Sequence, residues 1–446
     1  MSSALVEAAA HPISPDAATF ASLPLPLTQR VFLALPPDAR GRACCVCRAW
    51  RDALADPLLW TRLVVRAEEK ERFFSVLRGA AGRARSELYH LDVSQHEVPS
   101  DVLLQVLTAS AGSLRALHLR SLTISYGPPN GVTHEEVFAA APLLQVLAAE
   151  FVWCSWEEAP QMLRAEPPFA PLQMLGSLQV CFAGEEGPRG MECFRPFAAA
   201  LADAALHPAL SDITFELADT AQPDMMGALV DAALARRLRE LKLDDCEPPA
   251  VAPLARLLAE GSLTAFEVRA VAGSVRLLDA AGDAALVADA LRVNSTLTKL
   301  NFWGAHLCVE INRAVVLLSA LVGHPSLCTL VVVGQETAEQ DRIAFGAALG
   351  ALIAADAPAL RSLNCSYSRL GDAGLAPIVE ALPLNRHLLE LNLCHNGMSE
   401  AFARERLLPA VRANTTLREL ECTGYVLWAH AAEEAEELVR RRWQHD

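Results

Sequence analysis

The sequence predicts an α/β protein in which a short helical module is followed by a long array of repeated strand–helix units. The helical module is indicated by residues 22–65, where large apolar residues recur at helical spacing between proline-containing turns. The array is indicated by the unit LxxLxL, which recurs about every 30 residues from residue 88 onward. In each repeat, apolar residues first alternate with period two, as in a strand, and then follow a helical period.

Residues 22–65 are expected to form three short helices, separated by turns at 36–38 (Pro-Pro-Asp) and 56–57 (Asp-Pro). The large apolar residues of this segment include Leu27, Val31, Phe32, Leu35, Cys44, Val46, Cys47, Trp50, Leu54, Leu59 and Trp60. A unit of this size has too little interior to bury all of them. The apolar surplus therefore predicts a docking partner, and an ordinary helical bundle without a partner is the alternative.

The order and spacing of these residues resemble the F-box, the adaptor-docking module of Skp–cullin–F-box ubiquitin ligases. The resemblance rests on Leu23-Pro24, Val31-Phe32, Leu35, Val46-Cys47-Arg48, Trp50-Arg51, Asp56-Pro57 and Leu59-Trp60. It implies docking on a Skp-type adaptor, and through it on a cullin. The implied adaptor contacts are Leu23, Pro24, Leu27, Val31, Phe32, Leu35, Val46, Cys47, Trp50, Leu54 and Trp60. Two stretches depart from the family pattern: Leu25-Pro26 replaces a common acidic residue, and Ala39-Arg40 replaces a usual leucine.

The repeats behind this module are visible as direct self-similarity. NSTLTKLNF at 294–302 and NTTLRELEC at 414–422 align without gaps. The unit LxxLxL begins at Leu88, Leu114, Leu144, Leu175, Leu210, Leu238, Leu263, Leu297, Leu327, Leu360, Leu388 and Leu417. One strand–helix unit cannot close its own core, but stacked units bury a continuous one.

These repeats resemble leucine-rich repeats of the long, ribonuclease-inhibitor type. GDAGLAPIVEAL at 371–382 matches the helical half, and HLLELNLCHNGM at 387–398 matches the strand half, with Asn396 at the family's ladder position. The resemblance implies a solenoid whose curved parallel sheet is lined by helices. Residues 144–237 are the least regular part of the array.

The strands of such an array line a concave face, where residues between the inward leucines point to solvent. On this face we expect His118, Asp244, Asp245, Glu267, Asn301, Trp303, Tyr367, Glu390, Asn392, His395, Glu419 and Glu421. The residues predicted to bind a protein substrate are Trp303, Tyr367, Glu390, Asn392, His395 and Glu421. Exposed aromatic residues fit binding hot spots, although partial burial under a neighbouring loop is the alternative for Trp303 and Tyr367. The acidic bias predicts a basic segment on the partner.

The expected domain boundaries follow from these patterns. Residues 1–21 form a disordered tail, 22–65 the F-box, 66–86 a helical linker, 87–427 the solenoid of about twelve repeats, and 428–446 a C-terminal capping helix. In AAEEAEELVRRRWQ (431–444), glutamates come early and arginines late, as the helix dipole favours. A docking helix for another protein is the alternative for this segment.

Composition and motif searches exclude several classes of function. The net charge of −15 argues against nucleic acid and against anionic membrane surfaces, and no apolar run is long enough for a membrane span. Twelve cysteines without a secretion signal indicate reduced thiols and a cytoplasmic or nuclear protein. The Cys44-x-x-Cys47 pair lacks matching ligands and reads as core packing, and no catalytic motif occurs, so no catalytic residue, metal or cofactor is expected. Asn294 and Asn414 open N-x-T sequons but hold equivalent turn positions, which favours a structural role.

The sequence therefore predicts a non-catalytic substrate receptor of a ubiquitin ligase, in which the F-box docks the adaptor and the repeats hold the substrate. The alternative is a protein-binding scaffold with an F-box-like cap and no link to ubiquitin. A leucine-rich-repeat inhibitor or immune-type sensor is disfavoured because the chain has no nucleotide-binding P-loop. A bacterial-type repeat ligase is disfavoured because no Cys-x-Asp sequence occurs.

Overall fold

The computed structural model of the chain describes most of the sequence after its first 29 residues. The described ranges are 30–35, 37–46, 48–65, 73–84, 87–124, 131–155, 158–182, 187–217, 223–244, 251–269, 282–303, 311–333, 341–424 and 430–443. The chain divides into two compact units. Unit 1 comprises Met1–Leu122 and Pro129–Ala149, and unit 2 comprises Thr123–Pro128 and Glu150–Asp446.

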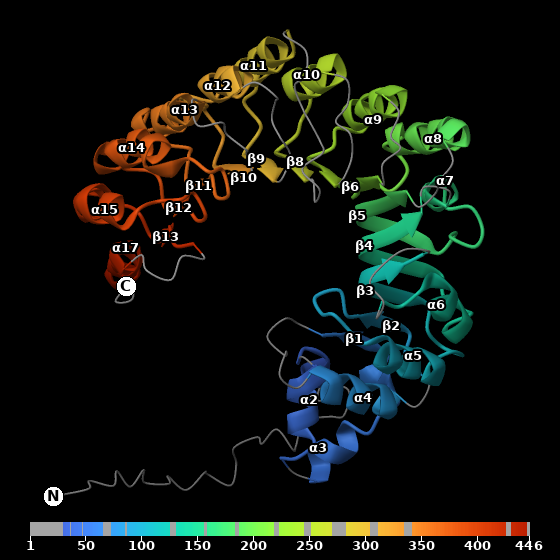
Figure 1. The fold of residues 1–446 in the computed structure, drawn as a ribbon. Coiled ribbons are helices and arrows are strands. Elements are labelled where there is room, and N and C mark those ends of the chain that lie inside the picture. Colours follow the sequence, from blue (N-terminus) through green and yellow to red (C-terminus); the bar gives the residue numbers. More distant parts are fainter. Residues whose placement is uncertain are drawn as a thin grey trace, which may run out of the picture. The chain divides into compact units, whose positions relative to one another are not determined.

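Unit 1 contains the N-terminal helical module and the first strands (Figure 1). Residues 30–33 are helical. The further elements are α2 (Pro37–Ala43), α3 (Arg48–Ala53), a 3-10 turn (Pro57–Trp60), β1 (Arg62–Val64), α4 (Phe73–Ala84), β2 (His90–Asp92), α5 (Ser100–Ala109), β3 (Ala116–Thr123), α6 (His134–Ala140) and the start of β4 (Val146–Ser155). The segment predicted to be helical throughout therefore ends in a strand, because Arg62–Val64 pairs with β2. Helix α4 lies within the predicted linker.

Unit 2 alternates strands and helices almost to its end. Its elements after β4 are α7 (Ala159–Leu163), β5 (Leu172–Phe182), α8 (Gly187–Ala202), β6 (Asp212–Leu217), α9 (Pro223–Arg236), β7 (Glu240–Asp244), α10 (Val251–Glu260), β8 (Ala265–Arg269), α11 (Asp283–Val293), β9 (Lys299–Trp303), α12 (Ile311–Ala320), β10 (Thr329–Val333), α13 (Arg342–Ala354), β11 (Ser362–Asn364), α14 (Gly371–Ala381), a 3-10 turn (Leu382–Leu384), β12 (Glu390–Asn392), α15 (Glu400–Phe402), a π turn (Ala403–Leu407), α16 (Leu408–Ala413), β13 (Glu419–Glu421) and α17 (His430–Trp443). Helices α8 to α14 lie on one side of this unit's strands (Figure 1).

The thirteen strands of the described chain follow the order of the sequence in one open parallel sheet. The register places the central leucine of each unit opposite that of the next. In unit 2 this row is Leu300, Leu330, Leu363, Leu391 and Leu420. All five are buried, at 6% exposure or less, on the side of the sheet that the helices cover. The predicted α/β fold, with its inward row of leucines, is confirmed.

In three repeats an asparagine joins the helix to the next strand. Asn414 donates to the carbonyls of Leu382 (2.7 Å) and Asn385 (3.0 Å) and accepts from the backbone N–H groups of Thr416 and Leu417. The side chains of Asn294 and Asn385 make the same kinds of bond in their own units. These bonds connect consecutive repeats inside a dry turn, which confirms the structural role predicted for Asn294 and Asn414.

His324 occupies the equivalent turn position after α12. Its Nδ1 accepts hydrogen bonds from the backbone N–H groups of Ser326 (3.4 Å) and Leu327 (3.2 Å). Burial lowers the pKa of His324, while the nearby Leu291 carbonyl opposes that shift. A neutral imidazole is therefore the form that serves this turn.

The ladder position predicted for Asn396 is also occupied as expected. Its side-chain amide donates to the carbonyls of Cys365 (2.9 Å) and Leu393 (3.0 Å), and its oxygen accepts from the N–H groups of Ser368 and Leu370. Asn396 is 2% exposed, so these bonds are shielded from water.

Helix α17 covers the last described strand. The indole N–H of Trp443 donates to the Leu417 carbonyl (2.8 Å), and Arg442 donates to the carbonyls of Asn414 (2.5 Å) and Val411 (3.0 Å). The Glu436 carboxylate accepts from the backbone N–H groups of Cys422 and Thr423, which would otherwise lie unpaired at the sheet's end. These contacts support the proposed capping role of the C-terminal helix.

Candidate protein-binding surfaces

The N-terminal module exposes a set of large apolar side chains. Val31 is 42% exposed, Leu33 is 52% exposed and Val46 is 64% exposed. Trp50 and Leu35 are half-buried, and the Trp50 ring meets the Phe32 ring edge-on at 5.5 Å between centroids. Val31, Leu35, Val46 and Trp50 were predicted as adaptor contacts and are accessible, whereas Leu33 was not predicted.

Three other predicted contacts form the core of the module and not its surface. Phe32, Leu54 and Trp60 are 1%, 0% and 0% exposed. The Trp60 indole donates to the Leu54 carbonyl at 2.9 Å, which fixes the turn after α3 against that helix. The free chain buries all three side chains, so their direct contact with an adaptor stays a prediction. Leu23, Pro24, Leu27 and Cys47 lie outside the described residues.

Arg40, one of the departures from the F-box pattern, has a structural role. Its guanidinium donates to the carbonyls of Leu35 (2.8 Å) and Leu59, and it lies 5.6 Å from the centre of the Trp60 ring. Arg83 of α4 lies 5.1 Å from the same ring. Burial lowers the pKa of Arg40, although a guanidinium stays charged over the physiological range. Arg40 thus links the backbone at Leu35 to the backbone at Leu59 by hydrogen bonds, at the position where the family usually has a leucine.

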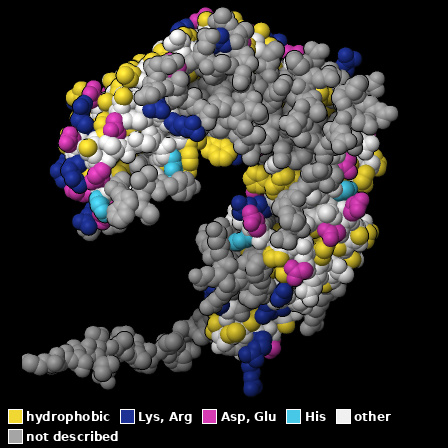
Figure 2. Space-filling view, viewed as in Figure 1, with side chains coloured by type: hydrophobic (Ala, Val, Ile, Leu, Met, Phe, Trp, Pro, Cys, Tyr) yellow, Lys and Arg dark blue, Asp and Glu magenta, His cyan; other side chains and the backbone are white. Residues whose placement is uncertain are grey.

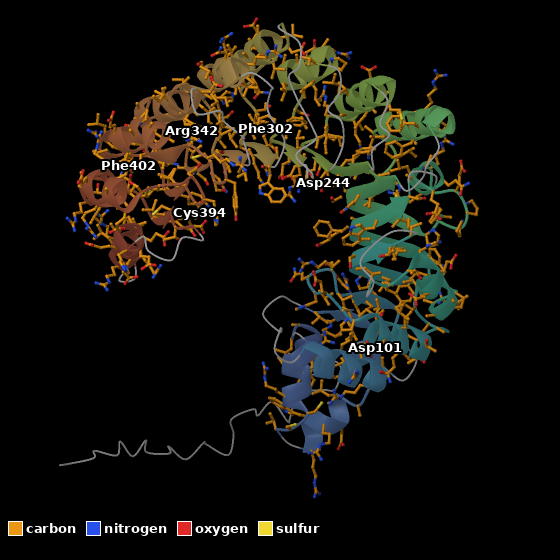
Figure 3. The ribbon with its side chains drawn as sticks, in the orientation of Figure 1. Asp101, Asp244, Phe302, Arg342, Cys394 and Phe402 are labelled. Carbon is orange, nitrogen blue, oxygen red and sulfur yellow. The ribbon has the colours of Figure 1, made fainter. Side chains whose placement is uncertain are left out.

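The strand face of unit 2 carries two exposed aromatic residues. Trp303, at the end of β9, is 47% exposed, and Tyr367, just after β11, is 48% exposed. Tyr367 stacks on His395 of the next repeat, with 4.2 Å between ring centroids. Hydrophobic side chains reach the surface on this face (Figure 2). In Figure 3, Asp244 and Cys394 lie on the strand side of the unit, whereas Arg342 and Phe402 lie on the helix side.

A left-handed backbone conformation holds the stacked pair in place. Tyr367 and His395 have φ angles of 58° and 57°. Side chains other than glycine, asparagine and aspartate rarely adopt this conformation, at a cost of about 1–2 kcal/mol each. The two turns are also linked directly, since the Tyr367 N–H donates to the Cys394 carbonyl (3.0 Å). Tyr367 and His395 therefore form one stacked aromatic platform.

An acidic pocket lies beside this platform, between β12, β13 and α17. Its volume is about 750 Å³, and it is lined by Leu389, Glu390, Cys394, Arg418, Glu419, Leu420, Glu421, Thr423, Glu436, Val439 and Arg440. Asn392, on β12, donates a hydrogen bond to Glu421. Four carboxylates against two guanidiniums give the pocket a net negative lining. Arg440 and Glu436 were missed because the sequence showed only a solvated cap helix, and Arg418 was missed because it precedes β13 and was not among the residues expected on the strand face.

The thiols described in this region are poor nucleophiles. Burial, together with Glu421 and Glu436, raises the pKa of Cys394 to about 11. Burial raises the pKa of Cys365 to about 12. Because the thiolate is the reactive form, both groups are protonated and unreactive at neutral pH.

The middle of the strand face is less acidic than predicted. Glu267 is 1% exposed and its carboxylate contacts Lys299 (2.7 Å), Arg269 (2.9 Å) and the Asn301 amide (3.1 Å). Burial alone would raise the pKa of Glu267, but the bond and charge of Lys299, with Lys242 and Arg269, hold it below its ordinary value. Glu267 and Asn301 (7% exposed) are therefore not solvent-exposed as predicted, and the Glu267 carboxylate is paired with Lys299 and Arg269.

The structure thus groups the predicted substrate-binding residues in two places. Glu390 and Glu421 line the acidic pocket next to the Tyr367–His395 platform, and Asn392 of β12 donates a hydrogen bond to Glu421. Trp303 is on β9, separated from β11 by β10. Asp245, expected on the same face, lies outside the described residues.

Comparison with known proteins agrees with the N-terminal assignment. The F-box-like family matches residues 20–66, so the predicted F-box is confirmed. No curated protein sequence matches the chain. No helix in the described ranges is both long and apolar enough to cross a bilayer.

Three solved structures are similar to the chain at low identity. A Bacteroides fragilis protein is 15% identical over 65% of this chain and 76% of its own, with a TM-score of 0.40. The yeast Rad7–Elc1 complex has a chain 13% identical over 86% of this chain and 81% of its own, with a TM-score of 0.40. The leucine-rich-repeat protein LegL7 of Legionella pneumophila is 14% identical over 75% and 81%, with a TM-score of 0.24. The chain combines an F-box-like domain with a leucine-rich-repeat fold, and its own repeated units carry the second assignment.

Proposed function

We propose that this chain is the substrate-recognition subunit of a Skp–cullin–F-box type ubiquitin ligase. The F-box-like domain would dock a Skp-type adaptor, and through it a cullin, while the repeats hold the protein to be ubiquitinated. The observation that carries the proposal is the pairing of an apolar docking module with a separate aromatic and acidic binding face in one chain. The chain itself would do no chemistry, because holding substrate near a conjugating enzyme raises the effective concentration of its lysines.

The adaptor surface is tested with the exposed residues of the module. Val31→Glu and Val46→Glu each place a charge where the free chain already exposes an apolar side chain, so the fold is expected to survive. A buried interface cannot accommodate an unpaired carboxylate, so each variant should lose co-purification of the Skp-type adaptor and the cullin. Leu384→Glu is the matched control, because Leu384 is 75% exposed but lies in unit 2. Retention of adaptor by both module variants contradicts the docking assignment.

The substrate surface is tested by reversing charge at the acidic pocket. Glu390→Lys with Glu419→Lys should reduce the set of proteins crosslinked to the chain, because complementary charge steers a basic segment to its site. Capture should also weaken as salt rises, since exposed charges are screened. Glu405→Lys, an exposed site on the helix side, is the control. An equal reduction of crosslinking in Glu405→Lys would contradict the assignment of the substrate to the acidic pocket.

A protein-binding scaffold without a ligase connection is the second candidate. It shares the same binding face but requires no adaptor. Capture of partners by the repeats together with absence of adaptor from the purified complex would favour the scaffold over the receptor.

A further inference from the structure

Two neighbouring strands of unit 1 bring two histidines and an aspartate to one face of the sheet. His90 and Asp92 are the first and last residues of β2, so both project to the same side, while Leu91 between them is buried on the other. In the parallel register, Asp92 lies opposite His118 of β3. Each of the three side chains is half-buried. They therefore share the side of the strands opposite the buried leucines.

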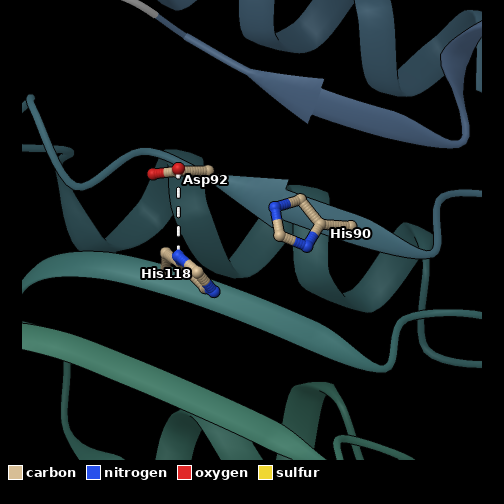
Figure 4. Close-up of side chains that lie close together, drawn as sticks. All are labelled: His90, Asp92 and His118. Carbon is tan, nitrogen blue, oxygen red and sulfur yellow. Dashed lines mark ion pairs between the residues drawn. The ribbon is translucent and has the colours of Figure 1, made fainter. Parts of the chain in front are cut away.

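The three side chains converge around one point (Figure 4). One nitrogen or oxygen atom from each lies within 4.8 Å of the other two. The Nδ1 atom of His118 is 3.8 Å from an Asp92 carboxylate oxygen, and the two imidazole ring centroids are 5.0 Å apart. These distances are longer than a hydrogen bond between the same atoms would be. Donors bound to one ion at about 2.0–2.2 Å lie about 3.3 Å apart, which small side-chain rotations can reach.

The aspartate is already oriented for such a role. One oxygen of the Asp92 carboxylate, Oδ1, accepts from the Ser94 backbone N–H (3.1 Å) and from the Ser94 hydroxyl (2.8 Å). The other oxygen, Oδ2, faces His118. Hydrogen bonds that hold the outer oxygen of a carboxylate are the usual support of a metal ligand.

His90 carries an unsatisfied polar atom at the same point. Its Nε2 is buried and makes no hydrogen bond within the described part of the chain. A buried ring nitrogen without a partner is rare, and a cation would satisfy it. Arg62, opposite His90 on β1, opposes the cation with its own charge but projects into solvent.

We propose that His90, Asp92 and His118 bind a divalent transition-metal ion on the strand face of unit 1. Two imidazole nitrogens and one carboxylate oxygen suit such an ion and leave at least one coordination position open. Side-chain exposures of 23% for Asp92 and 28% for His118 give the ion a path to the site. The site is independent of the proposed receptor role, because no adaptor or substrate contact proposed above uses these residues.

The experiment titrates the full chain with Zn²⁺ in a calorimeter. Wild-type protein is compared with His118→Ala, with Asp92→Asn, which keeps the shape of the side chain, and with His387→Ala, a half-buried histidine of unit 2. The cysteines are common to all four proteins, so any Zn²⁺ they bind cancels in the comparison. Melting temperatures without metal establish that each variant is folded.

We expect His118→Ala to lose one equivalent of tightly bound Zn²⁺. Asp92→Asn should lower the affinity for that Zn²⁺ ion by at least about 100-fold, the upper end of the loss in metal affinity caused by removing an outer-shell partner. His387→Ala should bind as the wild type does. Zn²⁺ should also raise the melting temperature of the wild type more than that of the two site variants, because a ligand that binds the native state stabilises it. Equal stoichiometry and affinity in all four proteins, or no Zn²⁺ binding by the wild type, overturns the proposal.

Discussion

Replacing Asn414 with alanine should destabilise the C-terminal repeats strongly, although the side chain contacts no ligand or partner surface. Asn414 is 1% exposed and makes four hydrogen bonds to backbone groups of two consecutive repeats. Alanine leaves the N–H groups of Thr416 and Leu417 without an acceptor in a place that water does not reach, whereas the carbonyls of Leu382 and Asn385 keep one donor each. A buried polar group left unpaired costs about 1–3 kcal/mol, so the two N–H groups alone give a loss of about 2–6 kcal/mol.

Asn364→Ala is the matched control for this prediction. The Asn364 side chain also accepts hydrogen bonds from the residue two positions on, Ser366, but it is half-buried on the strand face. Water can replace those bonds, so we expect a loss of about 1 kcal/mol or less. The asparagine chemistry is the same in both variants, and only the surroundings differ.

The assay combines urea unfolding, followed by circular dichroism, with hydrogen exchange read by mass spectrometry. Stacked repeats unfold through their neighbours, so exchange locates the loss that an overall curve would average. We expect Asn414→Ala to speed exchange in peptides spanning 382–424 and to leave those of unit 1 unchanged. Equal small losses in Asn414→Ala and Asn364→Ala would refute the reasoning that these asparagines hold the repeats together.

Three further predictions concern the turn histidine, the module core and the cap. The pKa of His324 is lowered on folding, so the unfolded chain binds the proton first and the free energy of unfolding falls as pH drops below about 6.5. His324→Asn should therefore lose less stability between pH 7.5 and 5.5, measured by urea unfolding, than the wild type does. An equal loss in both proteins would contradict this. Leu54→Ala should lower the free energy of unfolding by about 2–5 kcal/mol, because Leu54 is 0% exposed. Lost adaptor binding with an unchanged melting temperature would instead identify Leu54 as a surface contact. Deleting 428–446 should lower both solubility and melting temperature, because α17 covers β13; equality with the full chain in both would exclude a capping role.

The sequence was sufficient to predict the repeat architecture, because the leucines that point into the core recur at the same position of every strand. Leu300 and Leu330 lie opposite each other where the LxxLxL pattern places them, and Asn294 and Asn414 hold the turn that their shared position indicated. Local pattern determines these features, because each repeat packs only on its neighbours.

The sequence could not show which side of a helix faces a partner. Phe32 and Val31 are adjacent apolar residues, yet one is buried in the module and the other is 42% exposed. Helical periodicity identifies an apolar face, but it cannot divide that face between a core and a docking surface when both are apolar. The Trp60 ring lies against Arg40 and Arg83, which come from two other helices.

Sites assembled from neighbouring strands were likewise invisible in the sequence. His90 and His118 meet only because β2 and β3 pair in one register, and no motif within a single segment links them. Glu267 looked like part of an acidic face, but Lys299 of the next strand lies 2.7 Å from it and neutralises it. Cross-strand partners decide both cases.

The central claim is that the N-terminal module docks a Skp-type adaptor, and direct titration of the purified full chain with a purified adaptor tests it most directly. The account predicts saturable binding with one adaptor per chain. Val46→Glu should abolish it with the melting temperature unchanged, since Val46 is 64% exposed in the free chain, and Leu384→Glu should bind as the wild type does. Absence of binding by the wild type, or equal affinity in Val46→Glu and the wild type, would contradict the account.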